Sequence, residues 1–450
     1  MNKLFLLKRL RVKPAVAEVG ISLRTLLFLF TIHLSLFTAS AQDTSFARAT
    51  MDTLCSQYFA GRGYVDKGVD KASEYIAADF KKAKLERFHG ESGFFQKFDM
   101  SVNTFPGNLY LSVDRKELKP GQDYLVDPSS PGISKQPLKL YIVNDSFLAS
   151  FEKIKIRMAM QPFALVIDEG WLKAKKDTAG LHDKLAGTNP SVYIYIKDKL
   201  IWDASQNVGA KPVIWLKKDN FPKRPKGIIL EIENTFIPKY PMRNVVGYVK
   251  GKKYPDSFFV FSAHYDHLGK MGDNAYFPGA NDNASGVAML LDMMHYYSKP
   301  ENQPDYSIAF IAFTGEEAGL VGSTYFTKNP LLPLNKISFL INLDLEDNGQ
   351  DGMMVVNGSV FTHEYDKLDS LNKANNYLKE IKKRGKAANS DHYPFFEKNV
   401  RCFYVYLLGE YPYYHDIYDT PEKPTLKGYL GAFHLLTDFV GDLANDHNQK

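Results

Sequence analysis

Four apolar segments in the C-terminal half of the sequence restrict the possible fold more than any other feature. They lie at 244–249, 258–261, 308–313 and 337–341. Helical patterns lie between and after them, at about 284–298, 317–328, 362–380 and 425–444. Strands that are apolar throughout and alternate with helices are typical of a parallel sheet covered on both faces. We therefore predict an α/β fold with a mixed, mostly parallel central sheet and helices on both faces for residues 236–450.

A different pattern occupies residues 108–235. Short β-type segments, separated by Pro, Gly and Asp, lie at 109–111, 138–143, 163–167 and 212–216. This spacing is typical of a compact β-rich domain, and the segment contains no cluster of His, Cys and acidic residues. We predict a β-rich inserted domain at 108–235, preceded by a helical pattern over about 54–88.

The first 41 residues have the features of an export signal. An apolar run from Leu26 to Phe37 follows Arg24, and it ends in the small residues Ala39-Ser40-Ala41, after which a signal peptidase would cleave. The run is shorter than the about 20 apolar residues of a membrane-spanning helix. We expect a signal peptide at 1–41, an exported protein that is periplasmic or extracellular, and no stable membrane insertion after cleavage. An uncleaved signal anchor is the alternative.

Charge and cysteine content argue against two classes of protein. Residues 1–41 hold six of the 56 Lys and Arg and one of the 51 acidic residues, so the rest of the chain carries 50 of each. A nucleic-acid-binding domain normally has a basic excess, and we expect no nucleic-acid partner. Two cysteines are too few for a disulfide framework. We expect Cys55 and Cys402 to be buried free thiols, with a disulfide between them as the alternative.

Clusters of polar residues follow the predicted strands. His264-Tyr265-Asp266-His267, Thr314-Gly315-Glu316-Glu317 and Asn342-Leu343-Asp344 each stand where a strand ends. Asn281-Asp282-Asn283 stands where a helix begins, and Tyr413-Tyr414-His415-Asp416 precedes the last helix. Ligands of such sheets bind beyond the carboxyl ends of the strands, so these side chains are candidates for one site.

Each cluster also has an ordinary structural explanation. Asp and Asn are favoured helix N-caps, which accounts for one residue of 281–283 but not for all three. Acids in a first helical turn are favoured by the helix dipole. The adjacent carboxylates of Glu316 and Glu317 nevertheless repel each other unless a cation lies near them. Adjacent side chains project differently, so one could bind a cation while the other remains free as a base.

The combination of these residues indicates a metal site. Imidazole nitrogen and carboxylate oxygen are ligands of zinc, and a catalytic zinc site keeps one position for water. His, Asp, Glu, Asp and His at successive strand ends are what two zinc ions about 3.5–4 Å apart require in order to activate a shared water. Asp266, two residues after His264, could orient the ring of a histidine ligand. The sequence therefore predicts two Zn2+ ions per chain.

Several motifs occur in the order in which a known family carries them. They are His264-Tyr265-Asp266-His267-Leu268-Gly269, Gly279-Ala280-Asn281-Asp282-Asn283-Ala284-Ser285-Gly286, Gly315-Glu316-Glu317-Ala318-Gly319 and Asn342-Leu343-Asp344, together with Ala60-Gly61-Arg62-Gly63 and Ser390-Asp391-His392-Tyr393-Pro394-Phe395. Over about 50–110 and 240–445 the chain resembles the di-zinc exopeptidases, which include secreted bacterial aminopeptidases, glutamate carboxypeptidase and the transferrin receptor. The resemblance implies that 42–107 is the N-terminal part of the peptidase domain and that 108–235 is a protease-associated insert.

The resemblance also implies a role for each candidate residue. Asp282 would bridge both zinc ions, His264 and Asp344 would complete one, and Glu317 and His415 the other. Glu316 would be the general base that takes a proton from the bridging water, and Asp266 would orient His264. Tyr414 stands where some relatives place a tyrosine that stabilises the oxyanion, with Tyr411 and Tyr413 beside it. His267 and His392 would lie around the ligands.

We therefore expect a secreted zinc-dependent exopeptidase with a peptide substrate. Aminopeptidase activity is favoured because a carboxypeptidase needs Arg or Lys at the substrate carboxylate, and the one basic cluster near the motifs is Lys382-Lys383-Arg384. Carboxypeptidase and dipeptidase specificity stay open, as does the oligomeric state. Two other classes are a glutaminyl cyclase, which shares the fold but uses one zinc ion, and a binding protein on an inactive peptidase fold. Zinc content separates the three, at two ions, one or none.

Overall fold

The computed structural model describes residues 43–88, 93–176, 178–223 and 225–448. The chain divides into two units, Met1–Asp43 and Thr44–Lys450, and the second contains every helix and strand named here. The signal peptide expected at 1–41 lies outside the described residues. Within the part of the chain that the structure describes, no helix is both long and apolar enough to cross a membrane.

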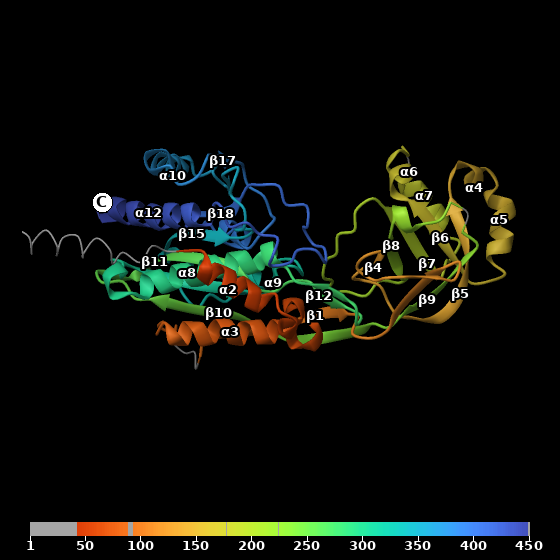
Figure 1. Ribbon diagram of the computed structural model, residues 1–450, viewed down its shortest axis with the longest axis horizontal. Helices are drawn as coiled ribbons and strands as arrows, with labels where there is room; N and C mark the ends of the chain where they lie inside the picture. Colours follow the sequence, from red (N-terminus) through yellow and green to blue (C-terminus); the bar gives the residue numbers. More distant parts are fainter. Residues whose placement is uncertain (1–42, 89–92, 177, 224, 449–450) are drawn as a thin grey trace, which may run out of the picture. The chain divides into compact units, whose positions relative to one another are not determined.

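The C-terminal part of the chain is built on an eight-stranded mixed sheet (Figure 1). In spatial order the strands are β1 (Phe95–Thr104), β10 (Thr235–Val249), β14 (Tyr306–Phe313), β11 (Tyr254–His264), β15 (Ile337–Leu343), β18 (Cys402–Leu407), β16 (Met353–Val356) and β17 (Ile381–Lys383). The four middle strands β14, β11, β15 and β18 run parallel, whereas β10 and β16 are antiparallel to their neighbours β14 and β18. The predicted mixed, mostly parallel sheet is therefore confirmed.

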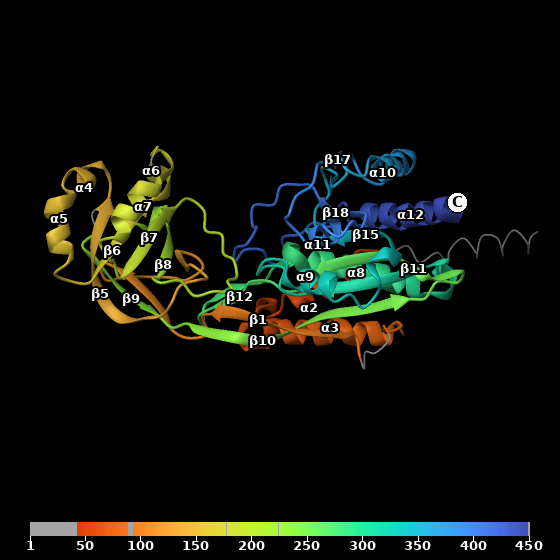
Figure 2. The same ribbon diagram turned by 180° about the vertical axis from the view of Figure 1, so that it is seen from behind.

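Side chains of this sheet alternate between two apolar cores. Phe259, Phe261 and Phe310 pack on one face, whose core also includes residues of α2 (Ser45–Leu54), α3 (Gly68–Lys82), α8 (Gly286–Ser298), α10 (Thr362–Asn375) and α12 (Tyr429–Asn448). Val260 and Ile311 pack on the other face, with α9 (Val321–Lys328) and α11 (His392–Phe396), both visible in Figure 2. Because both faces are covered by helices, the strands are apolar throughout, as predicted.

The helix expected over 54–88 is interrupted. A 3-10 turn (Gln57–Arg62) separates α2 from α3. Gly61 in this turn has a φ of +60°, and a Cβ there would lie 2.4 Å from the carbonyl oxygen of Phe277. The break therefore comes from the close approach of two distant backbone segments at a glycine, which the spacing of apolar residues does not reveal.

The helix expected at 317–328 begins later, at Val321. Gly315 and Gly319 have φ values of +72° and +102°, which lie outside the range of a right-handed helix. The two glutamates between them therefore lie in a turn after β14 and do not belong to a first helical turn.

The residues between β1 and β10 form a second eight-stranded sheet. Its spatial order is β3 (Lys116–Leu118), β2 (Leu109–Val113), β9 (Gly227–Ile232), β5 (Ile133–Val143), β6 (Phe163–Asp168), β7 (Val192–Lys197), β8 (Val213–Lys217) and β4 (Tyr124–Val126). One face packs with the hairpin of β12 (Gly269–Met271) and β13 (Ala275–Phe277), which belongs to the C-terminal part of the chain.

Four short helices cover the other face of this second sheet, and they are absent from the prediction for residues 108–235. They are α4 (Asp145–Ala149), α5 (Phe151–Met158), α6 (Glu169–Lys173) and α7 (Thr178–Ala186). The prediction of a β-rich domain thus describes the sheet but omits this helical layer. Two of the helices begin at side-chain caps, since Asn144 and Asp168 accept hydrogen bonds from backbone N–H groups of the first turn.

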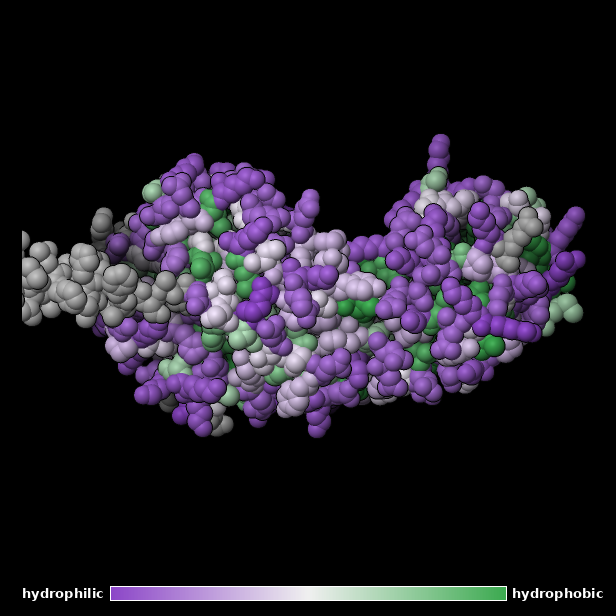
Figure 3. Space-filling view, in the orientation of Figure 1, coloured by the Kyte–Doolittle hydropathy of each residue, from purple (hydrophilic) through white to green (hydrophobic). Residues whose placement is uncertain are grey.

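Cys55 and Cys402 are both buried and unpaired, as expected. Burial raises the pKa of each thiol to about 12, so both are held in the unreactive protonated form. The outer face shown in Figure 3 is mostly hydrophilic with scattered apolar residues, which is usual for a protein surface.

Candidate metal centre

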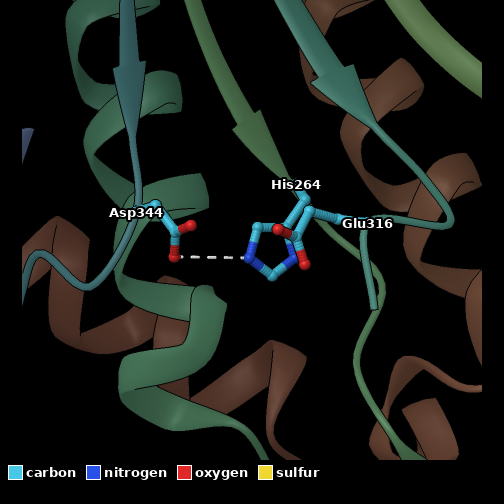
Figure 4. A group of neighbouring side chains, drawn as sticks. All are labelled: His264, Glu316 and Asp344. Atoms are coloured by element: carbon cyan, nitrogen blue, oxygen red, sulfur yellow. Dashed lines mark hydrogen bonds and ion pairs between the residues drawn. The ribbon is translucent and has the colours of Figure 1, made fainter. Parts of the chain in front are cut away.

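The predicted ligands lie where the parallel strands end. His264 is the last residue of β11, Asp344 follows β15, and the turn with Glu316 and Glu317 follows β14. Because these strands are parallel neighbours, their carboxyl ends meet at one edge of the sheet. Figure 4 shows side chains from all three strand ends pointing toward one another. Three motifs that are separate in the sequence therefore form one site.

Asp282 lies in a helical turn (Ala280–Ser285) before α8 and is held from two sides. The buried guanidinium of Arg62 donates to the two carbonyl oxygens just before the turn, at 2.7 Å each. The carboxylate of Asp419 accepts a hydrogen bond from the N–H of Asp282 at 3.1 Å. Because these backbone groups are satisfied on both sides, the position of Asp282 is fixed.

The two carboxylate oxygens of Asp282 face different histidines. Oδ1 lies 3.2 Å from Nε2 of His264, and Oδ2 lies 3.2 Å from Nε2 of His415. A further acid faces each ring, Asp344 at 3.3 Å from His264 Nε2 and Glu317 at 3.1 Å from His415 Nε2. The structure thus brings all five predicted ligands together, as two histidine–carboxylate pairs joined by one carboxylate.

The hydrogen bonds of the two imidazole rings show that cations fit between these groups. Nδ1 of His264 lies 3.2 Å from the carbonyl oxygen of Asp266, and Nδ1 of His415 lies 2.8 Å from that of Trp202. In a neutral ring the proton is therefore on Nδ1, and Nε2 has only a lone pair. Each Nε2 faces two carboxylate oxygens, which are also acceptors. A positive charge between them relieves this repulsion, and nitrogen with carboxylate oxygen is a donor set that zinc takes.

The pKa values of these groups show the same attraction for positive charge. Burial alone would lower the pKa of His264 and His415, but the surrounding carboxylates raise both. Burial would raise the pKa of Asp282, but hydrogen bonds to the two rings hold it well below its usual range. The site therefore stabilises negative carboxylates around a positive centre.

The ligand oxygens that point away from the rings also have partners. Ser390 Oγ donates to Asp344 Oδ2 at 2.6 Å and accepts from the side-chain amide of Asn342 at 2.8 Å. His267 Nδ1 lies 2.6 Å from Glu317 Oε1. Such partners fix the direction in which a ligand presents its remaining lone pairs.

Glu316 and Glu317 differ in their surroundings. Burial raises the pKa of Glu316 well above its usual value, and the charges of Asp344 and Glu317 add to the effect. Burial would raise the pKa of Glu317 as well, but His415 and His267 outweigh it and lower the value to about 2. Glu316 also has an oxygen within 4.8 Å of ligand atoms of His264 and Asp344 (Figure 4). The surroundings thus stabilise the charged form of Glu317 and the protonated form of Glu316.

Two other predicted residues lie at the edge of this set. The carboxylate of Asp266 is 3.9 Å from Nδ1 of His264, farther than its own carbonyl oxygen, and it accepts hydrogen bonds from Tyr64 Oη and the N–H of Glu316. Burial raises the pKa of Asp266 to about 6. The ring of Tyr414 stacks on that of His415, with centroids 3.9 Å apart.

One acid at this site, Asp203, is not among the residues predicted from the sequence. Its Oδ1 lies 3.0 Å from Nδ1 of His415, although the two residues are 212 positions apart and Asp203 lies between β7 and β8 of the second sheet. No motif or periodic pattern surrounds Asp203 in the sequence, so only the folded structure reveals the contact.

Known proteins resemble this chain in both sequence and fold. Aminopeptidase YwaD of Bacillus subtilis (strain 168) is 28% identical over 252 residues, which are 51% of this chain and 50% of that protein. A probable zinc metalloprotease of Pyrenophora teres f. teres is 30% identical over 152 residues, 33% of this chain and 30% of that protein. The matched segments therefore span half or less of the length of these curated relatives.

Solved structures share the fold over most of the chain. A zinc aminopeptidase from Bacillus subtilis has a TM-score of 0.66 at 19% identity and covers 89% of this chain and 95% of its own. A peptidase M28 precursor from Shewanella amazonensis SB2B has a TM-score of 0.65 at 14% identity, and it covers 93% of this chain and 97% of its own. Residues 244–440 match the model of peptidase family M28. This segment contains all five of the converging histidine and carboxylate ligands, and over it the chain is similar to peptidase family M28.

Proposed function

We propose that this protein is a zinc-dependent exopeptidase that removes N-terminal residues from peptides. The observation that carries the proposal is the position of Asp282, whose two oxygens each face one histidine–carboxylate pair. This is the arrangement expected of a carboxylate that bridges two cations. The match of residues 244–440 to the model of a peptidase family and the similarity to an aminopeptidase of Bacillus subtilis support it.

Each residue of the site has a proposed part in hydrolysis. Asp282 would bridge two zinc ions, with His264 and Asp344 on one and Glu317 and His415 on the other. When bound, the ions would make a shared water more acidic and polarise the peptide carbonyl.

The remaining steps depend on side chains beside the ligands. Glu316 would take the proton from water and return it to the leaving amine, which suits a carboxyl group whose pKa is raised. Asp266 would support the orientation of His264, and Tyr414 would stand beside the developing oxyanion.

The basic residues near the site favour an aminopeptidase over a carboxypeptidase. Among the described residues, none of the five ligands forms an ion pair with Lys or Arg. The basic cluster that could bind a substrate carboxylate is engaged elsewhere. Lys382 pairs with Glu380 at 2.8 Å, Lys383 lies over the ring of Tyr365, and Arg384 contacts the hydroxyl of Tyr406 at 3.4 Å. Because these side chains are engaged, the cluster is less available to a substrate carboxylate, which favours aminopeptidase over carboxypeptidase activity.

A panel of blocked peptides tests the direction of cleavage. One tripeptide would be prepared with both ends free, with the N-terminus acetylated and with the C-terminus amidated, and each form would be incubated with zinc-loaded protein. We expect cleavage of the free and amidated forms, release of the N-terminal residue, and none from the acetylated form. Cleavage of the acetylated form with loss on amidation would show a carboxypeptidase. Glu316→Gln protein serves as the control for contaminating peptidases.

The complete second half of the site argues against the single-zinc alternative. Glu317 and His415 lie 3.1 Å apart and both face the cation position opposite His264. A cyclase that uses one zinc ion has no need of this second pair, and a binding protein has no need of Glu316. Formation of pyroglutamate from an N-terminal glutamine peptide, without peptide-bond hydrolysis, would contradict the exopeptidase proposal.

We also propose that the protein is exported, because an apolar run within residues 1–41 ends at Ala39-Ser40-Ala41, the pattern of a signal peptide. Expression in a bacterial host followed by fractionation and N-terminal sequencing tests this. The expected product is found outside the cytoplasm and begins at Gln42. A protein that keeps its N-terminus and stays with the membrane would instead indicate a signal anchor.

A further inference from the structure

A segment of the second sheet's domain reaches the predicted metal site. It is the connection between β7 and β8, residues 198–212. Trp202 holds it in place, because its buried indole stacks on Phe277 with centroids 4.8 Å apart and donates from Nε1 to the carbonyl oxygen of Val126 at 2.7 Å. Since Val126 belongs to the second sheet and Phe277 to the hairpin of the C-terminal part, Trp202 is fixed by both parts of the protein.

The same connection contacts His415 at its backbone and at its ring. The N–H of Trp202 donates to the carbonyl oxygen of His415 at 3.1 Å. Nδ1 of His415 lies 2.8 Å from the carbonyl oxygen of Trp202 and 3.0 Å from a carboxylate oxygen of Asp203. His415 has a φ of +55°, a left-handed conformation that non-glycine residues rarely adopt. These contacts therefore support both the backbone conformation and the ring orientation of His415.

The two histidines of the site differ in what orients them. Nδ1 of His264 faces the carbonyl oxygen of Asp266, two residues further along its own loop. Nδ1 of His415 faces the carbonyl oxygen of Trp202 and the carboxylate of Asp203, which lie 213 and 212 positions away between strands of the second sheet. Only one side of the metal site is thus complete within the C-terminal part of the chain.

We infer that Asp203 is a positioning residue for the zinc ion next to Glu317 and His415, and that the inserted domain thereby completes one of the two metal positions. The inference rests on the proposed function, because it takes His415 as a zinc ligand. A carboxylate on the outer nitrogen of a metal-binding imidazole fixes its tautomer, fixes its orientation and makes the other nitrogen a stronger donor. Asp203 would act on His415 in this way.

The exposure of Asp203 makes this role testable. Its side chain is 55% exposed, so an amide in its place should leave the packing of both domains unchanged. Asp203→Asn keeps the shape of the side chain and removes its charge, while the carbonyl oxygen of Trp202 stays in place. The substitution therefore asks whether the carboxylate itself strengthens zinc binding.

Zinc release measured against a chelator of known affinity provides the test. Wild-type protein, Asp203→Asn, Asp203→Glu and His415→Ala would each be loaded with zinc and titrated. We expect Asp203→Asn to release one of its two ions at a chelator concentration about 10- to 100-fold lower than wild type, with the other ion unchanged. Asp203→Glu should recover part of the loss. His415→Ala identifies which release step belongs to this side of the site.

Asp198→Asn is the matched control. Asp198 begins the same connection, is 88% exposed and lies 3.9 Å from Lys218, away from the site. It should release both ions as wild type does. If Asp203→Asn also behaves as wild type, or if Asp198→Asn weakens binding as much, the inference is wrong while the proposed function stands. If wild-type protein does not hold two ions, the proposed function fails first and the inference with it.

Hydrogen exchange gives a second readout that does not depend on activity. Asp203 and the zinc ion would both stabilise the same position of the His415 ring. Because such coupling is reciprocal, zinc binding should also stabilise the connection at residues 198–212. The amide of Trp202, which donates to His415, should exchange more slowly in zinc-loaded than in metal-free wild-type protein. That difference should shrink in Asp203→Asn. Equal exchange with and without zinc in wild-type protein would overturn the inference.

Discussion

Glu316 and Glu317 are neighbours in the chain, yet their surroundings shift the pKa values of their carboxyl groups in opposite directions. The pKa of Glu316 is raised well above its usual value, first by burial, whereas two histidines lower that of Glu317 to about 2 against the effect of burial. Pairs of acids whose surroundings drive their pKa values apart commonly divide the work of a site, one as a charged group and one as a proton carrier. This division leads to the first prediction.

Glu316→Gln should keep both zinc ions and lose activity, because the amide preserves shape but cannot accept the proton of water. Positioned acid–base catalysis typically contributes about 10²–10⁴-fold, and we expect kcat to fall by that factor. Glu317→Gln should instead release zinc, because a charged ligand becomes neutral. Metal content and turnover of the two variants, measured side by side, check this. Zinc loss from Glu316→Gln with retention in Glu317→Gln would reverse the two roles.

Ser390→Ala should weaken zinc binding although it replaces none of the five ligands. The substitution removes the hydroxyl that donates to Asp344 and accepts from Asn342. We expect zinc affinity to fall about 10- to 100-fold, and the buried amide left without its acceptor should cost about 1–3 kcal/mol of unfolding free energy. Ser370→Ala, an exposed serine of α10, is the control. Unchanged zinc affinity in Ser390→Ala would show that the hydroxyl does not support Asp344.

Asp347 should make the protein less stable as the pH rises. Burial raises its pKa from 3.8 to about 8. Between these values the folded protein keeps a proton that the unfolded chain has lost, so unfolding releases a proton and the unfolding free energy falls with pH over this window. Asp347→Asn removes the titrating group.

Denaturant unfolding of metal-free protein at pH 5 and pH 8 checks the effect of Asp347. The gain in stability of Asp347→Asn over wild type should be larger at pH 8 than at pH 5. Asp351→Asn, which changes a more exposed acid of the same segment, should show no such trend. A gain that is the same at both pH values would contradict the raised pKa of Asp347.

The two thiols should react with a thiol reagent only after unfolding. Both are buried, and burial raises the pKa of each to about 12. We expect no reaction of folded protein at pH 8, and two thiols per chain in denaturant without a reducing agent. A titration that finds no thiols in denaturant would show that Cys55 and Cys402 form a disulfide.

The sheet and most of the site could be predicted because their signals are local. Strands such as β14 are apolar at nearly every position, and polar side chains follow directly where parallel strands end. His264, Glu317 and Asp344 therefore come together once the order of strands is known. Residue types alone then indicate the metal.

The features that could not be predicted depend on contacts between distant segments. Asp203 reaches His415 across 212 positions. The break at Gly61 is imposed by the approach of Phe277. The four helices that cover the second sheet are short, so each has too few turns for a helical period to stand out from the β-type segments around it.

The most direct test of the account is the zinc content of purified protein. Elemental analysis of zinc-loaded, gel-filtered wild-type protein should give two ions per chain, and Asp282→Ala should lose most of both because it removes the bridging carboxylate. Asp256→Ala, at the opposite end of β11, should keep two. One ion or none in wild-type protein, or two in Asp282→Ala, would contradict the claim that Asp282 joins two zinc positions.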